Sequence, residues 1–256
     1  MAKIFCIANQ KGGVGKTTTS VNLAAGLAKI GQRVLLVDLD PQGNATMGSG
    51  VDKRALALSV YDVLLESASI REAAVLAEQC GYHVLGANRE LAGAEVELVG
   101  EERRERRLKQ ALTAVDADYD FVLIDCPPSL SMLTLNGLCA AQGVIVPMQC
   151  EYFALEGLAD LTNTIRQVHA NLNRDLQIIG LLRVMFDPRI TLQNQVSAQL
   201  KDHFGDKVFD TVIPRNVRLA EAPSYGLPGV VFDPSAKGSQ AFVEFAREMV
   251  ERVKRM

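Results

Sequence analysis

The feature that most constrains this chain is a glycine-rich loop made of Lys11, Gly12, Gly13, Val14, Gly15, Lys16, Thr17 and Thr18. The run before it, residues 3–8, is almost entirely apolar, which is typical of a buried strand in a parallel sheet. After it, apolar residues recur at helical spacing until Gly31. A strand, a glycine loop and a helix in this order favour a phosphate cradle, because glycines let backbone N–H groups turn toward an anion. The alternative is a glycine-rich turn before a helix.

Residues of the loop suggest separate roles in binding a nucleoside triphosphate. We expect the Lys16 ammonium to reach the terminal phosphates and the Thr17 hydroxyl to bind Mg²⁺. The general pattern G-x-x-x-x-G-K-[ST] has a glycine where this chain has Gln10, and it does not require Lys11. A lysine at the start of the loop projects away from its own cradle, so Lys11 could contact phosphates held by a second subunit, as an arginine finger does. The alternative for Lys11 is a solvated loop lysine.

Apolar runs at residues 34–37, 119–125, 143–147, 177–184 and 207–213 predict further strands, with a weaker candidate at 83–85. Helices are expected at 156–171, 192–204 and 239–254, a helix-prone stretch at 53–79 and a Pro- and Gly-rich loop at 221–238. Strands that alternate with helices indicate an α/β fold, a doubly wound and mostly parallel sheet flanked by helices on both faces. No linker or repeat is evident, so we predict one domain over residues 1–256.

Acidic residues stand at the ends of two predicted strands. Asp38 and Asp40 follow the strand at 34–37, and Asp125 ends the strand at 119–125. The carboxyl ends of parallel strands form the ligand-binding edge of such a sheet. We therefore predict that Asp125 holds Mg²⁺ directly or through water, the alternative being an acid that caps the next turn. Asp40 is the candidate to orient the attacking water and Asp38 a candidate for the outer shell of the metal, although spacing alone does not choose between them.

Bulk composition does not indicate a nucleic-acid, membrane or metal-cluster protein. The formal charge is −3, so any basic surface must be local or built by assembly. No stretch approaches the ~20 apolar residues of a membrane span, and no secretory signal opens the chain. The five cysteines lack CxxC spacing and the three histidines are scattered, which favours reduced thiols in a cytosolic protein and no metal ligation by histidine. The charged run 101–107 predicts a solvated helix face, or else a contact surface for DNA or a partner.

Three motifs together resemble the ParA/Soj family of deviant-Walker partition ATPases: Asn9–Thr18, Asp38–Asn44 and Ile124–Ser129. Further matches at residues 149–157 and 213–224 extend the similarity over nearly the whole chain. The pattern is most similar to the small chromosomal type, without the N-terminal helix-turn-helix extension of some plasmid members. The resemblance implies an ATPase, cytoplasmic and nucleoid-associated, that partitions chromosomes or plasmids.

The resemblance also implies a mechanism. Mg-ATP drives two subunits into a sandwich homodimer in which Lys11 reaches the partner's nucleotide, and hydrolysis depends on Asp40. Pro214 and Asn216 are implied to lie near the adenine. The ATP dimer is implied to bind double-stranded DNA without sequence preference, and a ParB-like protein on centromere-like sites stimulates hydrolysis through a basic N-terminal segment. Residues that match DNA-binding positions of the family are Arg189 and Arg218, with a solvated arginine or a local ion pair as the alternative. The role of Arg215 stays open.

The same loop occurs in relatives with other functions. An ATPase that positions another cargo, such as a protein cluster, would keep the ATPase and the DNA binding. A MinD-like membrane ATPase would need an amphipathic tail, and the last helix carries an apolar stripe with Arg247, Arg252, Lys254 and Arg255. We expect that stripe to cover the sheet, and so expect no membrane partner. An iron–sulfur ATPase would need cysteines at the dimer axis, and Cys126-Pro-Pro-Ser129 is unlike a cluster loop.

Overall fold

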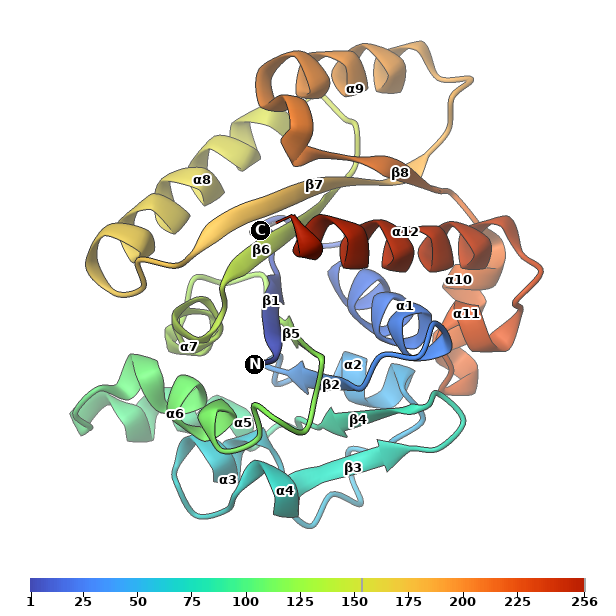
Figure 1. The fold of residues 1–256 in the computed structure, drawn as a ribbon. Helices are drawn as coiled ribbons and strands as arrows, with labels where there is room; N and C mark the ends of the chain where they lie inside the picture. The colour runs from blue at the N-terminus through green and yellow to red at the C-terminus, as the bar shows by residue number, and fades with distance from the viewer. Residues whose placement is uncertain (153, 256) are drawn as a thin grey trace.

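The computed structural model describes residues 1–152 and 154–255. At its centre is an eight-stranded sheet with the strand order β3-β4-β2-β5-β1-β6-β7-β8 (Figure 1). The strands are β1 (Lys3–Ile7), β2 (Val34–Asp38), β3 (Ala74–Ala77), β4 (Tyr82–Leu85), β5 (Phe121–Asp125), β6 (Gly143–Met148), β7 (Gln177–Phe186) and β8 (Val208–Pro214). Each apolar run expected to form a strand does so, because these runs are buried by layers on both faces.

The sheet is parallel except at one edge. β1 lies between β5 and β6 and pairs in parallel with both, whereas β3 pairs with β4 in antiparallel orientation. The register sets Ile7 beside Asp125 and Asp125 beside Asp38. The predicted doubly wound, mostly parallel architecture is confirmed, and the two strand-end acids lie on neighbouring strands.

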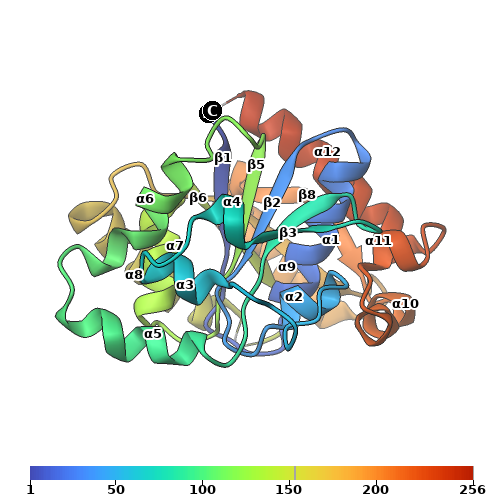
Figure 2. The same ribbon diagram turned by 90° about the horizontal axis from the view of Figure 1, so that it is seen from below.

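Helices cover both faces of the sheet. They are α1 (Lys16–Lys29), α2 (Asn44–Gly48), α3 (Val60–Leu64), α4 (Ile70–Ala73), α5 (Leu91–Glu97), α6 (Arg107–Thr113), α7 (Met132–Ala140), α8 (Ala154–Asn171), α9 (Thr191–Phe204), α10 (Val217–Glu221), α11 (Gly229–Phe232) and α12 (Lys237–Lys254). Short 3₁₀ turns occur at Leu98–Gly100, Arg104–Arg106, Gly205–Lys207 and Ala222–Tyr225. Viewed from below, α3, α5, α6, α7 and α8 lie on one side of the strands and α1, α2, α10, α11 and α12 on the other (Figure 2).

The apolar stripe of the last helix packs into the core. Phe242, Phe245, Ala246 and Met249 of α12 are buried in the cluster that also contains the apolar face of α1. The two helices approach so closely at Gly26 that an added Cβ would lie 3.1 Å from the Ala246 Cβ. The expectation that this stripe covers the sheet is confirmed. Among the described residues, no helix has the length and apolar character to cross a membrane.

Two stretches differ from the expected helices. Residues 53–79 contain two short helices, each begun by a capping box at Ser59 or Ser69, and the last part is the strand β3. Glu66 has a left-handed backbone (φ 61°), which ends the first of these helices. The helix-prone stretch is thus only partly helical, because pairing of residues 74–77 with β4 outweighs the helix propensity of the alanines.

Two other expectations about irregular regions are also corrected. The loop expected over 221–238 contains the 3₁₀ turn Ala222–Tyr225 and the short helix α11. The charged run 101–107 is no helix face, because Arg103 has a left-handed backbone (φ 53°) and a 3₁₀ turn follows it. Arg107, the first residue of α6, forms ion pairs with Glu66 and Glu101. The structure does not test whether this run contacts DNA or a partner.

Candidate nucleotide-binding site

The glycine loop joins β1 to α1 as predicted, and its backbone requires glycine at two positions. Gly13 (φ 73°) and Gly15 (φ 77°) are left-handed, a conformation that side chains with a Cβ rarely adopt. Gly15 directly precedes α1, so the positive end of the helix faces the loop. The Lys16 Nζ atom donates to the Lys11 carbonyl oxygen (3.1 Å), across the mouth of the loop. Burial lowers the pKa of Lys16, and the charges of Asp125 and Asp40 oppose this shift, so both acids lie within its electrostatic reach.

Asp125 and Thr17 meet at the carboxyl edge of the sheet. The Thr17 hydroxyl donates to Asp125 Oδ2 (2.8 Å), and the Ser20 hydroxyl donates to Asp125 Oδ1 (2.8 Å). Burial raises the pKa of Asp125 to about 6, although the two hydroxyl donors act in the opposite direction. A hydroxyl and a carboxylate in contact are the hard oxygen ligands that Mg²⁺ takes beside substrate phosphates. Ser20, one helical turn beyond Lys16, is a contact that the loop motif did not indicate.

Mg²⁺ binding beside phosphates does not require a cluster of protein ligands. Within the described ranges, no group of three or more His, Cys, Asp or Glu side chains could hold a metal ion. The five cysteines are free and buried. The donor set of Thr17 and Asp125 therefore fits an ion that reaches the site together with a nucleotide.

Asp38 and Asp40 have different environments despite their spacing. Asp38 is fully buried and accepts hydrogen bonds from the Thr46 N–H and hydroxyl (both 2.8 Å) and from the Asp40 N–H (3.1 Å). Asp40 is only partly buried, and its carboxylate accepts from the Gln42 N–H (2.9 Å). Asp38 thus fixes the start of α2 and the loop that carries Asp40. The carboxylate of Asp40 is the one of the two that solvent can reach.

Lys11 is not free in the single chain. Its Nζ atom forms an ion pair with Glu151 Oε2 (2.6 Å), and both side chains are about half exposed, at 51% and 47%. The neighbouring Gln149 donates from Nε2 to the Gly13 carbonyl oxygen (3.1 Å). The loop after β6 therefore contacts the cradle at two points. The sequence match at residues 149–157 marked this loop but did not reveal either contact.

A mostly apolar pocket of about 290 Å³ opens beside the cradle, where β8 ends. Its lining includes Gly15, Thr18, Pro214, Arg215 and Asn216. Thus Pro214 and Asn216 lie next to the loop, where the resemblance placed the adenine. The size and apolar character suit a flat heterocyclic base. The Oδ1 atom of Asn216 also caps α10, accepting from the Arg218 N–H (2.9 Å).

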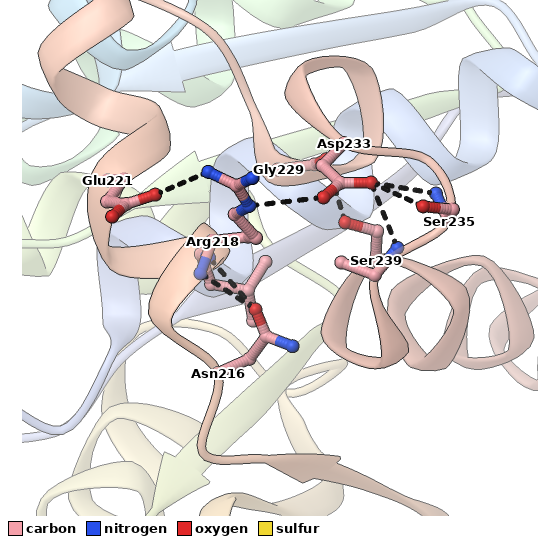
Figure 3. Close-up of polar contacts among 9 residues, drawn as sticks. Asn216, Arg218, Glu221, Gly229, Asp233, Ser235 and Ser239 are labelled. Carbon is pink, nitrogen blue, oxygen red and sulfur yellow. Dashed lines mark hydrogen bonds and ion pairs between the residues drawn. The ribbon is translucent and has the colours of Figure 1, made fainter.

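Both predicted DNA-binding arginines form local ion pairs. Arg189 pairs with Asp187 (2.7 Å) and holds the pKa of that carboxyl at about 2, yet 88% of the arginine side chain is exposed. Arg218 pairs with Glu221 of α10 (2.9 Å) and with Asp233 beyond α11 (3.3 Å), so it links two segments (Figure 3). The structure brings neither arginine into the nucleotide site. Their assignment to DNA stays a prediction.

Comparison with known proteins identifies the family. A family model described as an AAA domain matches residues 2–178. The Soj protein of Bacillus subtilis, named a sporulation initiation inhibitor, is 53% identical over 97% of this chain and 98% of its own length. The chromosome partitioning protein ParA of Caulobacter vibrioides is 50% identical over 98% of this chain and 94% of its own. This chain belongs to the ParA/Soj family of chromosome-partitioning ATPases. The resemblance based on the three motifs is confirmed.

Solved structures agree with this ParA/Soj assignment at the level of the fold. A Mycobacterium smegmatis protein named cobyrinic acid a,c-diamide synthase, bound to ADP and magnesium, has a TM-score of 0.87 at 41% identity, over 99% of this chain and 96% of its own. The cell division ATPase MinD of Pyrococcus furiosus has a TM-score of 0.80 at 24% identity, which supports the shared fold alone. The ParA/Soj chain thus has the architecture of nucleotide-binding P-loop proteins.

Proposed function

We propose that this ParA/Soj chain uses Mg-ATP to close into a homodimer that binds DNA, and that hydrolysis reopens it during chromosome or plasmid partition. The observation that carries the proposal is the contact of Thr17 with Asp125 beside a glycine cradle that contains a buried Lys16. The magnesium-bound nucleotide of the Mycobacterium smegmatis neighbour supports ATP and Mg²⁺ as ligands here. Residues 1–256 act as one unit in this proposal.

The cradle residues bind and orient the triphosphate. Backbone N–H groups of residues 12–18 point their dipoles at the phosphates, and Lys16 exchanges its contact with the Lys11 carbonyl for a phosphate oxygen. Thr17 and Asp125 hold Mg²⁺, the latter directly or through water, and the ion supplies positive charge against the phosphate oxygens. The apolar pocket at Pro214 and Asn216 takes the base.

Asp40 orients the attacking water in this proposal. Asp40 is partly exposed and lies in electrostatic reach of Lys16, whereas Asp38 is buried and accepts hydrogen bonds from Thr46. A positioned carboxylate can accept a hydrogen bond from water and aim its lone pair at the terminal phosphorus. Asp38 serves as a positioning residue, because the Asp40 N–H donates to it.

Dimer closure brings Lys11 to the nucleotide of the partner. The lysine lies at the exposed start of the cradle, and its ammonium is held by an exposed ion pair with Glu151. A second positive charge on the phosphates would stabilise the transition state, as an arginine finger does. Closure also aligns two copies of Arg189 and Arg218 into the basic surface that a chain of net charge −3 lacks. A ParB-like partner stimulates hydrolysis at the nucleoid.

Trapping the closed state tests this proposal. Asp40→Ala should bind Mg-ATP, hydrolyse it poorly and accumulate as a DNA-bound dimer, because the cradle and the Thr17–Asp125 contact remain intact. Light scattering would measure the dimer, and phosphate release with and without DNA and a candidate ParB would measure turnover. A variant that stays monomeric when saturated with Mg-ATP would overturn the sandwich dimer. If Asp40→Ala hydrolyses ATP at the normal rate, another residue must orient the attacking water. ATP-dependent DNA binding combined with turnover that the candidate ParB does not change would favour a different cargo.

A further inference from the structure

The two edge strands of the sheet, β8 and β3, are protected differently. On β8, the carboxylate of Glu248 accepts hydrogen bonds from the N–H groups of Asp210 (2.8 Å) and Thr211 (2.9 Å), which blocks the addition of another strand. On β3, the outermost strand at the other edge (Figure 1), the pairing with β4 accounts for every hydrogen bond found in the described ranges for the backbone of Val75 and Leu76. An edge strand directs alternate N–H and C=O groups outward, so β3 presents a template for a further strand.

The side chains of β3 are those of a covered strand, not of an exposed edge. Its sequence, Ala-Val-Leu-Ala, is short but contains no charged residue and no proline, two of the devices that keep an edge from pairing. Val75 and Leu76 point to opposite faces of the sheet, yet they are 41% and 50% exposed. Exposed apolar surface on both faces of an uncapped edge indicates that another chain covers it.

A groove of about 680 Å³ runs beside this edge. Besides β3, its walls come from residues 49–52 and 55–58, from residues 72, 73, 78 and 79 next to the strand, and from Tyr225–Leu227. Four strand residues span about 13 Å, so the groove suits a short extended peptide. Tyr225 at the groove is 66% exposed and its ring stacks on Phe232 at 4.7 Å, which provides a pre-ordered aromatic contact of the kind enriched in interfaces.

The charge of the groove indicates which kind of ligand it can bind. Its charged lining residues are all acidic, namely Asp52, Glu72 and Glu78. Self-pairing of two β3 strands in antiparallel orientation would bring Glu72 of one copy toward Glu78 of the other, a like-charge contact that disfavours a second copy of this chain. We propose that the groove binds an extended, positively charged peptide segment of a partner protein, which adds a strand to β3.

This proposal concerns a surface separate from the nucleotide cradle, so it is tested without ATP. The probe is a fluorescently labelled peptide in which Lys alternates with Val, and the readout is its anisotropy with the full chain. We expect saturable binding, weaker by at least about tenfold for a peptide in which Glu replaces Lys. A Lys–Val peptide N-methylated at alternate residues keeps its charge but cannot donate ladder hydrogen bonds, so its binding should be lost.

Paired protein variants locate the binding. Leu76→Lys places a charge on the edge and should abolish binding, whereas Leu192→Lys makes the same change at an exposed leucine of α9 and should leave it intact. Circular dichroism confirms that both variants fold. Absence of saturable binding, equal binding of the Lys and Glu peptides, equal binding after N-methylation, or equal effects of the two variants would each overturn the proposal. A nucleotide-free dimer that Leu76→Lys dissociates would assign the groove to a second copy and also overturn it.

Discussion

The ion pair between Lys11 and Glu151 leads to a quantitative prediction about dimer formation. In the proposed dimer, Lys11 must leave Glu151 before its ammonium can contact the partner's phosphates. With side chains 51% and 47% exposed, solvent screens the pair, so that breaking it costs about 0.2–1 kcal/mol per protomer. Each dimer breaks two such pairs. Glu151→Gln should therefore tighten ATP-dependent dimerisation by roughly 2- to 30-fold.

Sedimentation velocity with saturating Mg-ATP measures this effect, with Asp40→Ala present in every sample to slow hydrolysis. Glu156→Gln is the matched control, because it removes an exposed carboxylate from the first turn of the nearby helix α8. The difference between the two variants should shrink at 1 M salt, where the Debye length is only about 3 Å.

Two results would refute this reasoning. If Glu151→Gln and the control dimerise with equal affinity at low salt, breaking the ion pair does not contribute to the free energy of dimerisation. If it dimerises more weakly than the control, Glu151 contributes to the dimer contact itself. If Glu151→Gln still dimerises more tightly than the control at high salt, the increase in affinity does not come from release of Lys11.

Further predictions address the other parts of the site. Lys16→Ala should lose Mg-ATP binding in calorimetry, and tight magnesium-dependent binding by this variant would contradict the cradle assignment. Arg189→Ala should weaken DNA binding and make the plot of log affinity against log salt shallower by about 0.9 for each phosphate that the arginine no longer neutralises; an unchanged slope would exclude Arg189. Glu221→Gln removes one of the two acids that hold Arg218, so DNA affinity should rise, and a fall would argue against an Arg218 contact with DNA. Burial raises the pKa of Asp38 from 3.8 to about 7, so folding loses stability as the pH rises through that window. In magnesium-free thermal denaturation, the melting temperature of Asp38→Asn should therefore rise relative to that of the wild type as the pH increases through this window. A difference in melting temperature that does not change with pH would contradict the raised pKa of Asp38.

The fold and the cradle were predictable because their signals are local. A buried parallel strand is a continuous apolar run, and the glycine loop between residues 11 and 18 needs left-handed backbone at fixed positions. Strand-end acids follow from the same logic, since a parallel sheet gathers its carboxyl ends at one edge. The motifs predicted that Thr17 and Asp125, 108 positions apart, serve the same Mg²⁺ site, and the structure adds the hydrogen bond between them.

The remaining contacts depend on geometry that periodicity does not encode. Glu151 meets Lys11 across 140 positions, and only the path of the loop after β6 brings them together. The sequence of β3 favours helix over strand, because a short alanine-rich strand has no clear period. Only the structure distinguishes Asp38 from Asp40, because it shows that Asp38 is buried and accepts hydrogen bonds from Thr46. Two acids two residues apart cannot be told apart by their spacing in the sequence.

The ion pairs of Arg189 and Arg218 determine how readily each guanidinium could bind a DNA phosphate. Arg189 keeps 88% of its side chain exposed while Asp187 is 21% exposed, so a phosphate could approach the guanidinium without displacing the carboxylate. Arg218 is held by acids from two segments, and a phosphate would have to replace at least one of them. Exposed pairs contribute only about 0–1 kcal/mol each, so this exchange is possible but reduces the affinity gained per contact. In the proposed DNA complex, Arg189 would therefore be available without losing its ion pair, whereas the contribution of Arg218 would depend on movement of α10 relative to Asp233.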